Sequence, residues 1–327
     1  MEITKERVIS KPVRLSVMKF NLHFRFIDNR KLLNIAILVI VFIFCFIVAF
    51  FPRMTGPSGD FWGSAVMRAQ DLLARRDPYF SHEVSAMSIP YPATAFLVGI
   101  PFASLSSQIA GPLFEAITGT LLAYGLMRGG QYWRLMALAS YPFLENLNTC
   151  QWSSLLACIV LFPDFLPFAL VKPHIALPAV LWRFPTRRAI LLTALFLLAS
   201  FVIYPTWPLV WLSQISQYEG VSFIPVLLPG GLLLLMSALR WRTPEGRLLL
   251  SMSLLPKRPI YDSFLLMLIP KTWQEMLFLT LASWVYGLHL IFPIMFWVGQ
   301  VTIYLASFIL VIKPLFVRKK TLVPVPG

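Results

Sequence analysis

The sequence predicts an all-α fold, a polytopic bundle of transmembrane helices, and both composition and hydropathy indicate it. Of the 327 residues, 58% are hydrophobic and only 13% are charged, and the mean hydropathy is +0.74. Soluble globular domains carry about 25% charged residues, so an ordinary soluble surface is excluded. We therefore expect about 10–12 membrane segments, which together form one transmembrane domain over residues 32–312.

The first of these segments, residues 32–51, offers about 20 residues without a charge, enough to cross the roughly 30 Å hydrocarbon layer of a bilayer. It is too long for a removable signal peptide and lacks a small-residue cleavage site, so we interpret it as a retained helix. Residues 1–31 hold eight Lys or Arg and three acids. By the positive-inside bias, this N-terminal segment is cytoplasmic, and residues 52–90 form the first extracytoplasmic loop.

The first loop contains a predicted amphipathic helix. After Gly59-Asp60-Phe61-Trp62, apolar and charged side chains follow a helical pattern as far as Arg76, and the Asp77-Pro78-Tyr79 turn ends it. Such a helix suits the plane of the lipid headgroups. A helix that merely tethers the loop to the interface has the same pattern, so this alternative stays open.

Ten further apolar stretches predict the remaining crossings. They cover residues 91–107, 110–127, 134–149, 151–163, 165–182, 189–204, 221–239, 248–270, 274–291 and 293–312. Basic clusters that the same bias places in the cytoplasm lie at 183–188, 240–247 and 313–320, the last within a basic tail over 313–327. Charge also places 128–134 inside, whereas strict alternation places it outside. Either one segment among 91–127 is re-entrant, or the charge bias fails there.

Prolines interrupt the middle of the chain. Pro163, Pro167, Pro173 and Pro178 fall within residues 151–184. Repeated loss of helical hydrogen bonds predicts short or broken helices, which membranes tolerate only where they are buried in protein or line a wet cavity. A purely architectural role for these prolines is equally consistent with the pattern.

Several function classes are excluded or unsupported. The formal net charge of +14 does not indicate nucleic acid, because the basic residues lie at span ends and no nucleic-acid module is recognisable. Cys45, Cys150 and Cys158 lie in or beside apolar spans and are odd in number, which indicates ordinary buried thiols. No metal-binding, nucleotide-binding or dinucleotide-binding motif occurs, so we expect neither a metal site nor a cofactor.

Asp60 is the candidate catalytic residue. It follows the first membrane exit, with a glycine before it and two aromatic residues after it, at the boundary between water and lipid. A carboxylate held there can act as general base on an acceptor hydroxyl. The alternative is an N-cap for the helix that follows, which the position fits equally well. Trp62, Tyr79 and Tyr91 are candidates for the wall of the same cavity.

Basic residues outside the cytoplasmic clusters are candidates for binding phosphate. Lys257 and Arg258 can return to the outer face after a short apolar run, and Lys172 can lie away from the cytoplasmic clusters. Arg offers a forked pair of donors and Lys a point charge to phosphate oxygens. Snorkelling of long cationic side chains to lipid headgroups is the alternative.

His174 and Gln151 complete the candidate site. His174, beside Lys172-Pro173, is either a second base or phosphate donor, or a hydrogen-bonded structural histidine. Gln151 begins an apolar stretch, where an amide needs a partner. That partner is either another helix or a sugar hydroxyl.

These motifs occur in an order that resembles glycosyltransferase family 87, the bacterial polyprenol-phosphate-mannose-dependent α-1,2-mannosyltransferases with the membrane-embedded GT-C fold. The resemblance covers roughly residues 30–270 and rests on Asp60, Asp77-Pro78-Tyr79, Tyr91-Pro92, Gln151, Lys172-Pro173 and the run from Pro256 to Tyr261. It implies a plasma-membrane enzyme that transfers a sugar, with inversion, from a polyprenyl-phosphate donor to a lipid- or glycan-linked acceptor at the outer face. Asp60 resembles the family's first-loop acid, Lys172 its KP-motif lysine and Tyr261 its late-loop aromatic.

Two other function classes stay open. A secondary transporter or lipid flippase would need many ionisable residues in its spans and two halves that echo one another, and no internal repeat is evident. A non-catalytic membrane subunit, including a degenerate transferase, would associate stably with another membrane protein. The expected partners of the enzyme are the lipid-linked donor and acceptor and the surrounding membrane lipids.

Overall fold

The computed structural model describes residues 29–56, 59–80, 90–216, 223–257, 260–292 and 295–316. Throughout these ranges the regular structure is helical, apart from one isolated antiparallel bridge between Phe223 and Lys257. The all-α prediction is therefore confirmed. The basic N-terminal segment up to residue 28, the tail from residue 317 and Arg258 lie outside the described residues.

The helices differ widely in length. The α-helices are α1 (Asn29–Thr55), α2 (Met67–Leu73), α3 (Ala93–Gly99), α4 (Ser107–Met127), α5 (Tyr141–Thr149), α6 (Ser153–Leu161), α7 (Pro173–Trp182), α8 (Arg187–Ile203), α9 (Trp207–Ile215), α10 (Pro244–Leu254), α11 (Trp273–Trp284) and α12 (Met295–Phe316). The π-helix η1 (Trp62–Val66) precedes α2. The 3₁₀ helices are η2 (Ile100–Phe102), η3 (Arg128–Gly130), η4 (Tyr132–Ala139), η5 (Pro163–Val171), η6 (Pro225–Leu227), η7 (Gly231–Arg240), η8 (Tyr261–Leu268) and η9 (Tyr286–Leu290).

Fewer helices are long enough to span a bilayer than the sequence predicted. Among the described residues, three qualify by length and composition, in α1, α4 and α12, and a fourth is added if α8 and α9, bent by 91°, count as one. The predicted stretch 151–184 is divided among α6, η5 and α7, and prolines begin the last two, where a missing N–H costs no helical bond. Short, broken helices are confirmed there.

The outer surface is apolar where a lipid-facing surface is expected. Within an apolar stretch of 18 residues in each helix, only 17% is buried in α1, against 67% in α4. Exposed apolar side chains on α1, α8 and η7 include Leu32, Ile35, Ile40, Ile43, Ile190, Leu195, Leu198, Val202, Leu232, Leu233 and Leu239. A soluble monomer rarely exposes so many large apolar side chains together. The chain therefore has the spans and the surface of a membrane protein.

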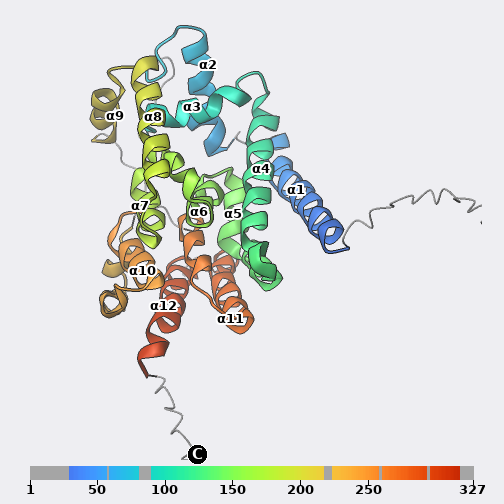
Figure 1. The fold of residues 1–327 in the computed structure, drawn as a ribbon, viewed down its shortest axis with the longest axis vertical. Coiled ribbons are helices and arrows are strands. Elements are labelled where there is room, and N and C mark those ends of the chain that lie inside the picture. The colour runs from blue at the N-terminus through green and yellow to red at the C-terminus, as the bar shows by residue number, and fades with distance from the viewer. Residues whose placement is uncertain are drawn as a thin grey trace, which may run out of the picture.

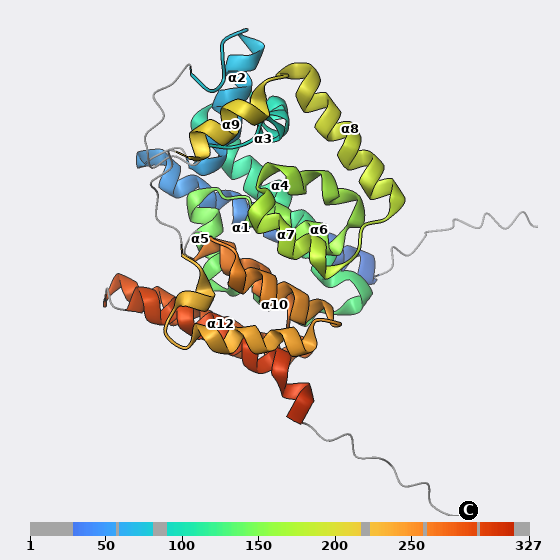
Figure 2. The same cartoon turned by 90° about the vertical axis from the view of Figure 1, so that its left-hand side faces the viewer.

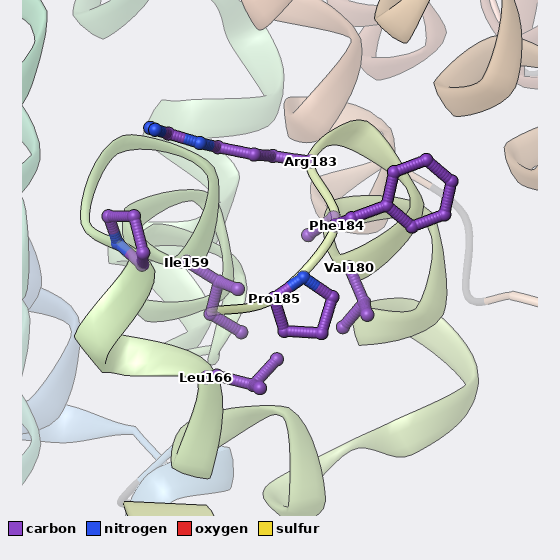
Figure 3. Close-up of a pocket in the computed structure, with 8 residues that line it drawn as sticks. Ile159, Leu166, Val180, Arg183, Phe184 and Pro185 are labelled. Carbon is purple, nitrogen blue, oxygen red and sulfur yellow. The ribbon is translucent and has the colours of Figure 1, made fainter. Parts of the chain in front are cut away.

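The ends of several helices meet at one end of the bundle, which we call the basic end. There Arg128, after α4, donates to the carbonyl oxygen of Leu161 in α6 at 3.5 Å. Arg247 at the start of α10 donates to the carbonyls of Leu181 and Trp182 in α7, at 2.6 and 3.0 Å. Ile159 of α6 and Arg183, which follows α7, line one small cavity (Figure 3).

The basic end shows how residues 91–127 are arranged relative to α1. Arg30 at the start of α1 and Arg128 at the end of α4 line one cavity, so α4 returns to the end where α1 begins. Helix α3 is only seven residues long and lies across α2 at the top of Figures 1 and 2. The backbone of Gly99 in α3 approaches that of Ala65 so closely that a Cβ would lie 2.4 Å from the carbonyl oxygen. Only α4 in this stretch is long enough to cross.

The predicted first-loop helix exists, and it packs against the protein core. Phe61 stacks on Phe114 with ring centroids 3.9 Å apart and contacts Trp152 edge to face at 5.2 Å. Asp71 is fully buried, whereas Leu73 is 62% exposed, the reverse of the expected pattern. Burial of Asp71 is possible because Arg76 pairs with it at 2.9 Å.

Helix α9 covers the end of the first loop. Tyr204 before it donates to Asp77 at 2.7 Å, Trp211 donates to the carbonyl of Pro90 at 3.0 Å, and Gln214 donates to the carbonyl of Tyr79 at 3.1 Å. Figures 1 and 2 both place α9 beside α3 and α8, far from α11 and α12. The predicted turn at Asp77 is confirmed, since its carboxylate accepts from the Tyr79 N–H at 2.9 Å.

Candidate functional site

Asp60 begins the helix that leads into η1, just beyond the end of α1. Its position is fixed by its neighbours, because the Phe61 N–H donates to the carbonyl of Cys150 at 3.0 Å. Gly59 has φ +84°, and a Cβ there would lie 2.9 Å from the Cβ of Cys150. Only glycine fits both the conformation and the close approach. The break between α5 and α6 therefore anchors the candidate base.

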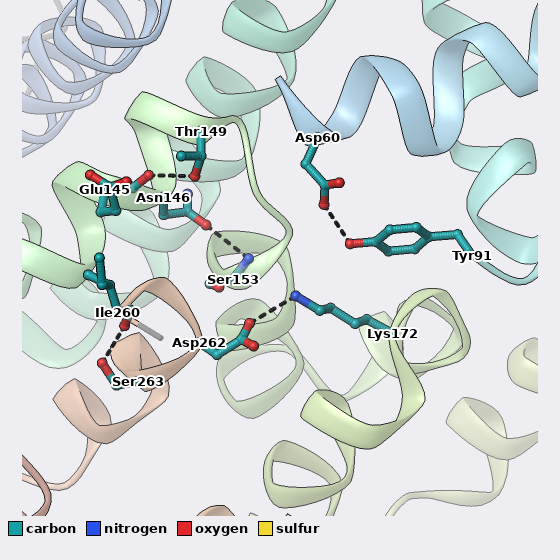
Figure 4. A network of polar contacts seen from close by, with 10 residues as sticks. All are labelled: Asp60, Tyr91, Glu145, Asn146, Thr149, Ser153, Lys172, Ile260, Asp262 and Ser263. Carbon is teal, nitrogen blue, oxygen red and sulfur yellow. Dashed lines mark hydrogen bonds and ion pairs between the residues drawn. The ribbon is translucent and has the colours of Figure 1, made fainter. Parts of the chain in front are cut away.

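Tyr91 holds the carboxylate of Asp60. Its hydroxyl donates to Asp60 Oδ2 at 2.5 Å (Figure 4). The carbonyl of Tyr91 in turn accepts from the hydroxyl of Tyr79 at 3.0 Å. Burial and then the negative charge of Asp60 raise the pKa of Tyr91, so its hydroxyl remains a donor at neutral pH. Two of the three predicted cavity-wall aromatics are thus part of the Asp60 environment.

Lys172 is buried and paired. Its ammonium lies 2.9 Å from Asp262 Oδ1, and the two side chains are 1% and 0% exposed (Figure 4). The same ammonium lies 5.1 Å from the ring centroid of Tyr261. Sequence analysis missed Asp262, although an acid inside a predicted span, here 248–270, is itself a signal of a functional position.

The Asp60 group and the Lys172 group form one electrostatic neighbourhood. The carboxylate of Asp262, the partner of Lys172, acts electrostatically on Tyr91, as the carboxylate of Asp60 does. His174 is largely buried in the first turn of α7. The charges of Lys172, Asp262 and Lys257 act on its imidazole. In Figure 4 the side chain of Asp60 points toward the hydroxyl of Tyr91, and that of Lys172 points toward Asp262.

Lys257 lies in the connection between α10 and η8, outside the candidate spans. It is 1% exposed, donates to the carbonyl of Met252, and lies 5.0 Å from the ring centroid of Tyr304. Its backbone exchanges two 3.0 Å hydrogen bonds with Phe223. Burial lowers the pKa of Lys257 to about 7, against a smaller opposing effect of Asp262. Arg258, which we predicted to bind phosphate together with Lys257, lies outside the described residues.

Gln151 lies at the break between α5 and α6. It is 5% exposed, and its Oε1, like the Nε1 of Trp152, has no hydrogen-bond partner. The break itself is held by Asn146, whose Nδ2 donates to Glu115 Oε2 at 2.7 Å and whose Oδ1 accepts from the Ser153 N–H at 3.0 Å. Glu115, fully buried in α4, was also missed, and again an acid inside a predicted span was the available signal.

Other candidate features contribute less. Trp62 is half-buried and packs against the hydrophobic core. The cavity beside Arg183 has a volume of about 10 Å³, room for one water and too little for a substrate (Figure 3). In the described part of the chain, no group of three or more His, Cys, Asp or Glu side chains could hold a metal ion. The three cysteines are buried free thiols, as expected.

Comparison of the chain with protein-family models, with curated protein sequences and with solved structures finds no match.

Proposed function

We propose that this chain is a membrane glycosyltransferase with a GT-C-type bundle, which transfers a hexose from a polyprenyl-phosphate donor to a lipid- or glycan-linked acceptor at the outer face of the plasma membrane. The observation that carries the proposal is one neighbourhood that joins Asp60 and Tyr91 to Lys172 and Lys257. These groups come from parts of the chain up to about 200 residues apart. A base and two cations together are what such a transfer needs.

The orientation rests on charge. Lys172 and Lys257 lie at the opposite ends of α7 and α10 from Arg183 and Arg247. The positive-inside bias then places the basic end in the cytoplasm and the Asp60 neighbourhood toward the outer face. The proposals that the sugar is mannose and that the chain belongs with glycosyltransferase family 87 rest on the order of motifs in the sequence.

In the proposed reaction, Asp60 takes the proton from the acceptor hydroxyl while the oxygen of that hydroxyl attacks the anomeric carbon of the donor sugar. The bond between that carbon and the donor's phosphate oxygen breaks, and the phosphate leaves with the electron pair. Tyr91 keeps the carboxylate in place by its hydrogen bond at 2.5 Å. Attack from the side opposite the leaving phosphate inverts the anomeric configuration.

The cations act on the leaving group. An ammonium carries three N–H donors, so Lys172 keeps donors for phosphate oxygens while one bond goes to Asp262. Charges fixed where negative charge develops stabilise the transition state most effectively in a site shielded from water. The unpartnered Oε1 of Gln151 is suited to accept a hydrogen bond from a sugar hydroxyl.

Donor class is tested directly with membranes that contain the chain. We expect incorporation of radiolabelled mannose from polyprenyl-phosphate mannose into a lipid extract. When the synthesis of the polyprenyl donor is blocked, radiolabelled mannose added as a nucleotide sugar should not be incorporated. Membranes without the chain are the control. Absence of transfer from polyprenyl-phosphate mannose and polyprenyl-phosphate glucose alike would contradict the proposal.

Lys257 predicts a pH dependence. Because its pKa is lowered from 10.5 to about 7, the ammonium that binds phosphate is lost as the pH rises through 7, and KM for the donor should increase. Lys257→Arg keeps its charge, so its KM should stay flat between pH 6 and 8.5. The unfolded chain holds this proton more tightly, so wild-type stability should rise from about pH 7 toward 10.5. Identical pH profiles for the two proteins would exclude this role of Lys257.

A further inference from the structure

The basic end contains a second candidate site, far from Asp60 along α1 and α4. An open cavity of about 490 Å³ lies between the start of α1 and the end of α4. Its lining includes Arg30, Asn34, Tyr124, Arg128, Gly130 and Tyr132. Two guanidinium groups therefore border one cavity, and no acidic side chain is among its described lining residues.

The backbone is shaped around one of these arginines. Gly130 has φ +77°, and a Cβ at this position would lie 2.6 Å from Arg30 Nη2. Its neighbour Gly129 has a similar φ of +74°, but a Cβ there would meet open space. Glycine at 130 thus serves the placement of Arg30 as well as the turn. The second guanidinium, of Arg128, is held by the carbonyl of Leu161 at 3.5 Å and lies 5.8 Å from the ring centroid of Phe162.

The surroundings of the cavity are those of a membrane surface. Leu32 and Leu33, which follow Arg30 and Lys31 in the first turn of α1, are 48% and 51% exposed, and Tyr124 on the cavity wall is 51% exposed. Both flanking helices are long and apolar enough to span a bilayer. An occupant here meets two cations at the helix ends and apolar side chains along α1. The hydroxyl of Tyr132, tied to Asn34 at 2.8 Å, adds a polar edge.

We propose that this cavity binds the phosphate headgroup of an anionic phospholipid, whose acyl chains lie along the exposed face of α1. Guanidinium groups donate paired hydrogen bonds to phosphate oxygens. Basic pockets between transmembrane helices at the cytoplasmic surface bind anionic headgroups in preference to zwitterionic ones. This site is independent of the proposed sugar transfer and needs no catalytic activity.

The test titrates delipidated, full-length protein with lipid and counts bound lipids by native mass spectrometry. Phosphatidylglycerol should bind at least tenfold more tightly than phosphatidylcholine with the same acyl chains. The double variant Arg30→Gln/Arg128→Gln should lose this preference, since each cation near the surface contributes about fivefold. The control Arg187→Gln/Arg242→Gln removes two exposed arginines outside the cavity and should keep it. Equal binding of both lipids, or a preference that survives the first double variant, overturns the proposal.

A matched pair of glycine variants separates the cavity from general surface charge. Gly129→Ala and Gly130→Ala carry similar backbone strain, but only the second displaces Arg30. Phosphatidylglycerol binding should therefore weaken in Gly130→Ala and persist in Gly129→Ala, with equal thermal midpoints in detergent. An equal effect of both variants contradicts the placement of Arg30. Competition by millimolar inorganic phosphate would instead assign the cavity to a soluble phosphate and overturn the lipid assignment.

Discussion

Replacement of Asp60 by Asn is expected to lower the rate of sugar transfer by about 10²- to 10⁴-fold, the range that a positioned general base contributes. Asn has the same shape, and its amide oxygen can still accept the hydrogen bond that Tyr91 donates. Only the capacity to take a proton is removed. The initial rate of radiolabelled mannose transfer, measured at saturating donor, reports the loss.

Two further variants make this result interpretable. Asp164→Asn also removes one acid, but at a site where the carboxylate is 45% exposed and pairs loosely with Arg188 at 3.4 Å, so transfer should match wild type. Tyr91→Phe leaves the base in place without its buried donor, and should lower the rate less than Asp60→Asn does. Turnover of Asp60→Asn at the wild-type rate would remove the central assignment.

The second large effect concerns the buried pair of Lys172 and Asp262. Lys172→Met leaves a buried carboxylate without its ammonium partner, which is expected to cost about 3–5 kcal/mol in free energy of unfolding. The double variant Lys172→Met/Asp262→Leu removes both charges and should recover most of that stability. Sugar transfer should not recover, because the cation that we propose to bind the donor's phosphate is still absent. Thermal unfolding in detergent and the transfer assay are measured on the same preparations.

An exposed ion pair provides the comparison for this cycle. Arg188→Met breaks the pair with Asp164, whose side chains are 76% and 45% exposed, and should cost less than about 1 kcal/mol. If the double variant regains both stability and transfer, Lys172 serves folding alone. If Lys172→Met is as stable as wild type, the pair is not buried as described.

Local sequence patterns were enough to select several residues of the candidate site, because each lies where a helix begins or ends. Asp60 follows the first span, Tyr91 precedes α3, and Lys172 precedes Pro173 at the start of α7. Prolines and charge changes mark such positions in any sequence. Pairing across the fold could not be predicted in the same way, since 90 residues separate Lys172 from Asp262.

The number of long spans was overestimated for a related reason. Hydropathy shows that a stretch is apolar, but it does not show where the helix bends or ends. Residues 91–107 are apolar because α3 is buried against η1, as the contact of Gly99 with Ala65 shows, and not because they cross a bilayer. Acids inside apolar stretches, such as Glu115 and Asp262, indicated buried contacts that hydropathy averages conceal.

The hydrogen bonds between α9 and the end of the first loop have a consequence for biosynthesis. Tyr79 and Pro90 emerge from the ribosome more than a hundred residues before their partners Gln214 and Trp211. The end of the first loop must therefore remain incompletely packed while α4 to α8 are synthesised. A nascent chain stalled before residue 204 should expose this end of the loop to protease, and one stalled after α12 should protect it.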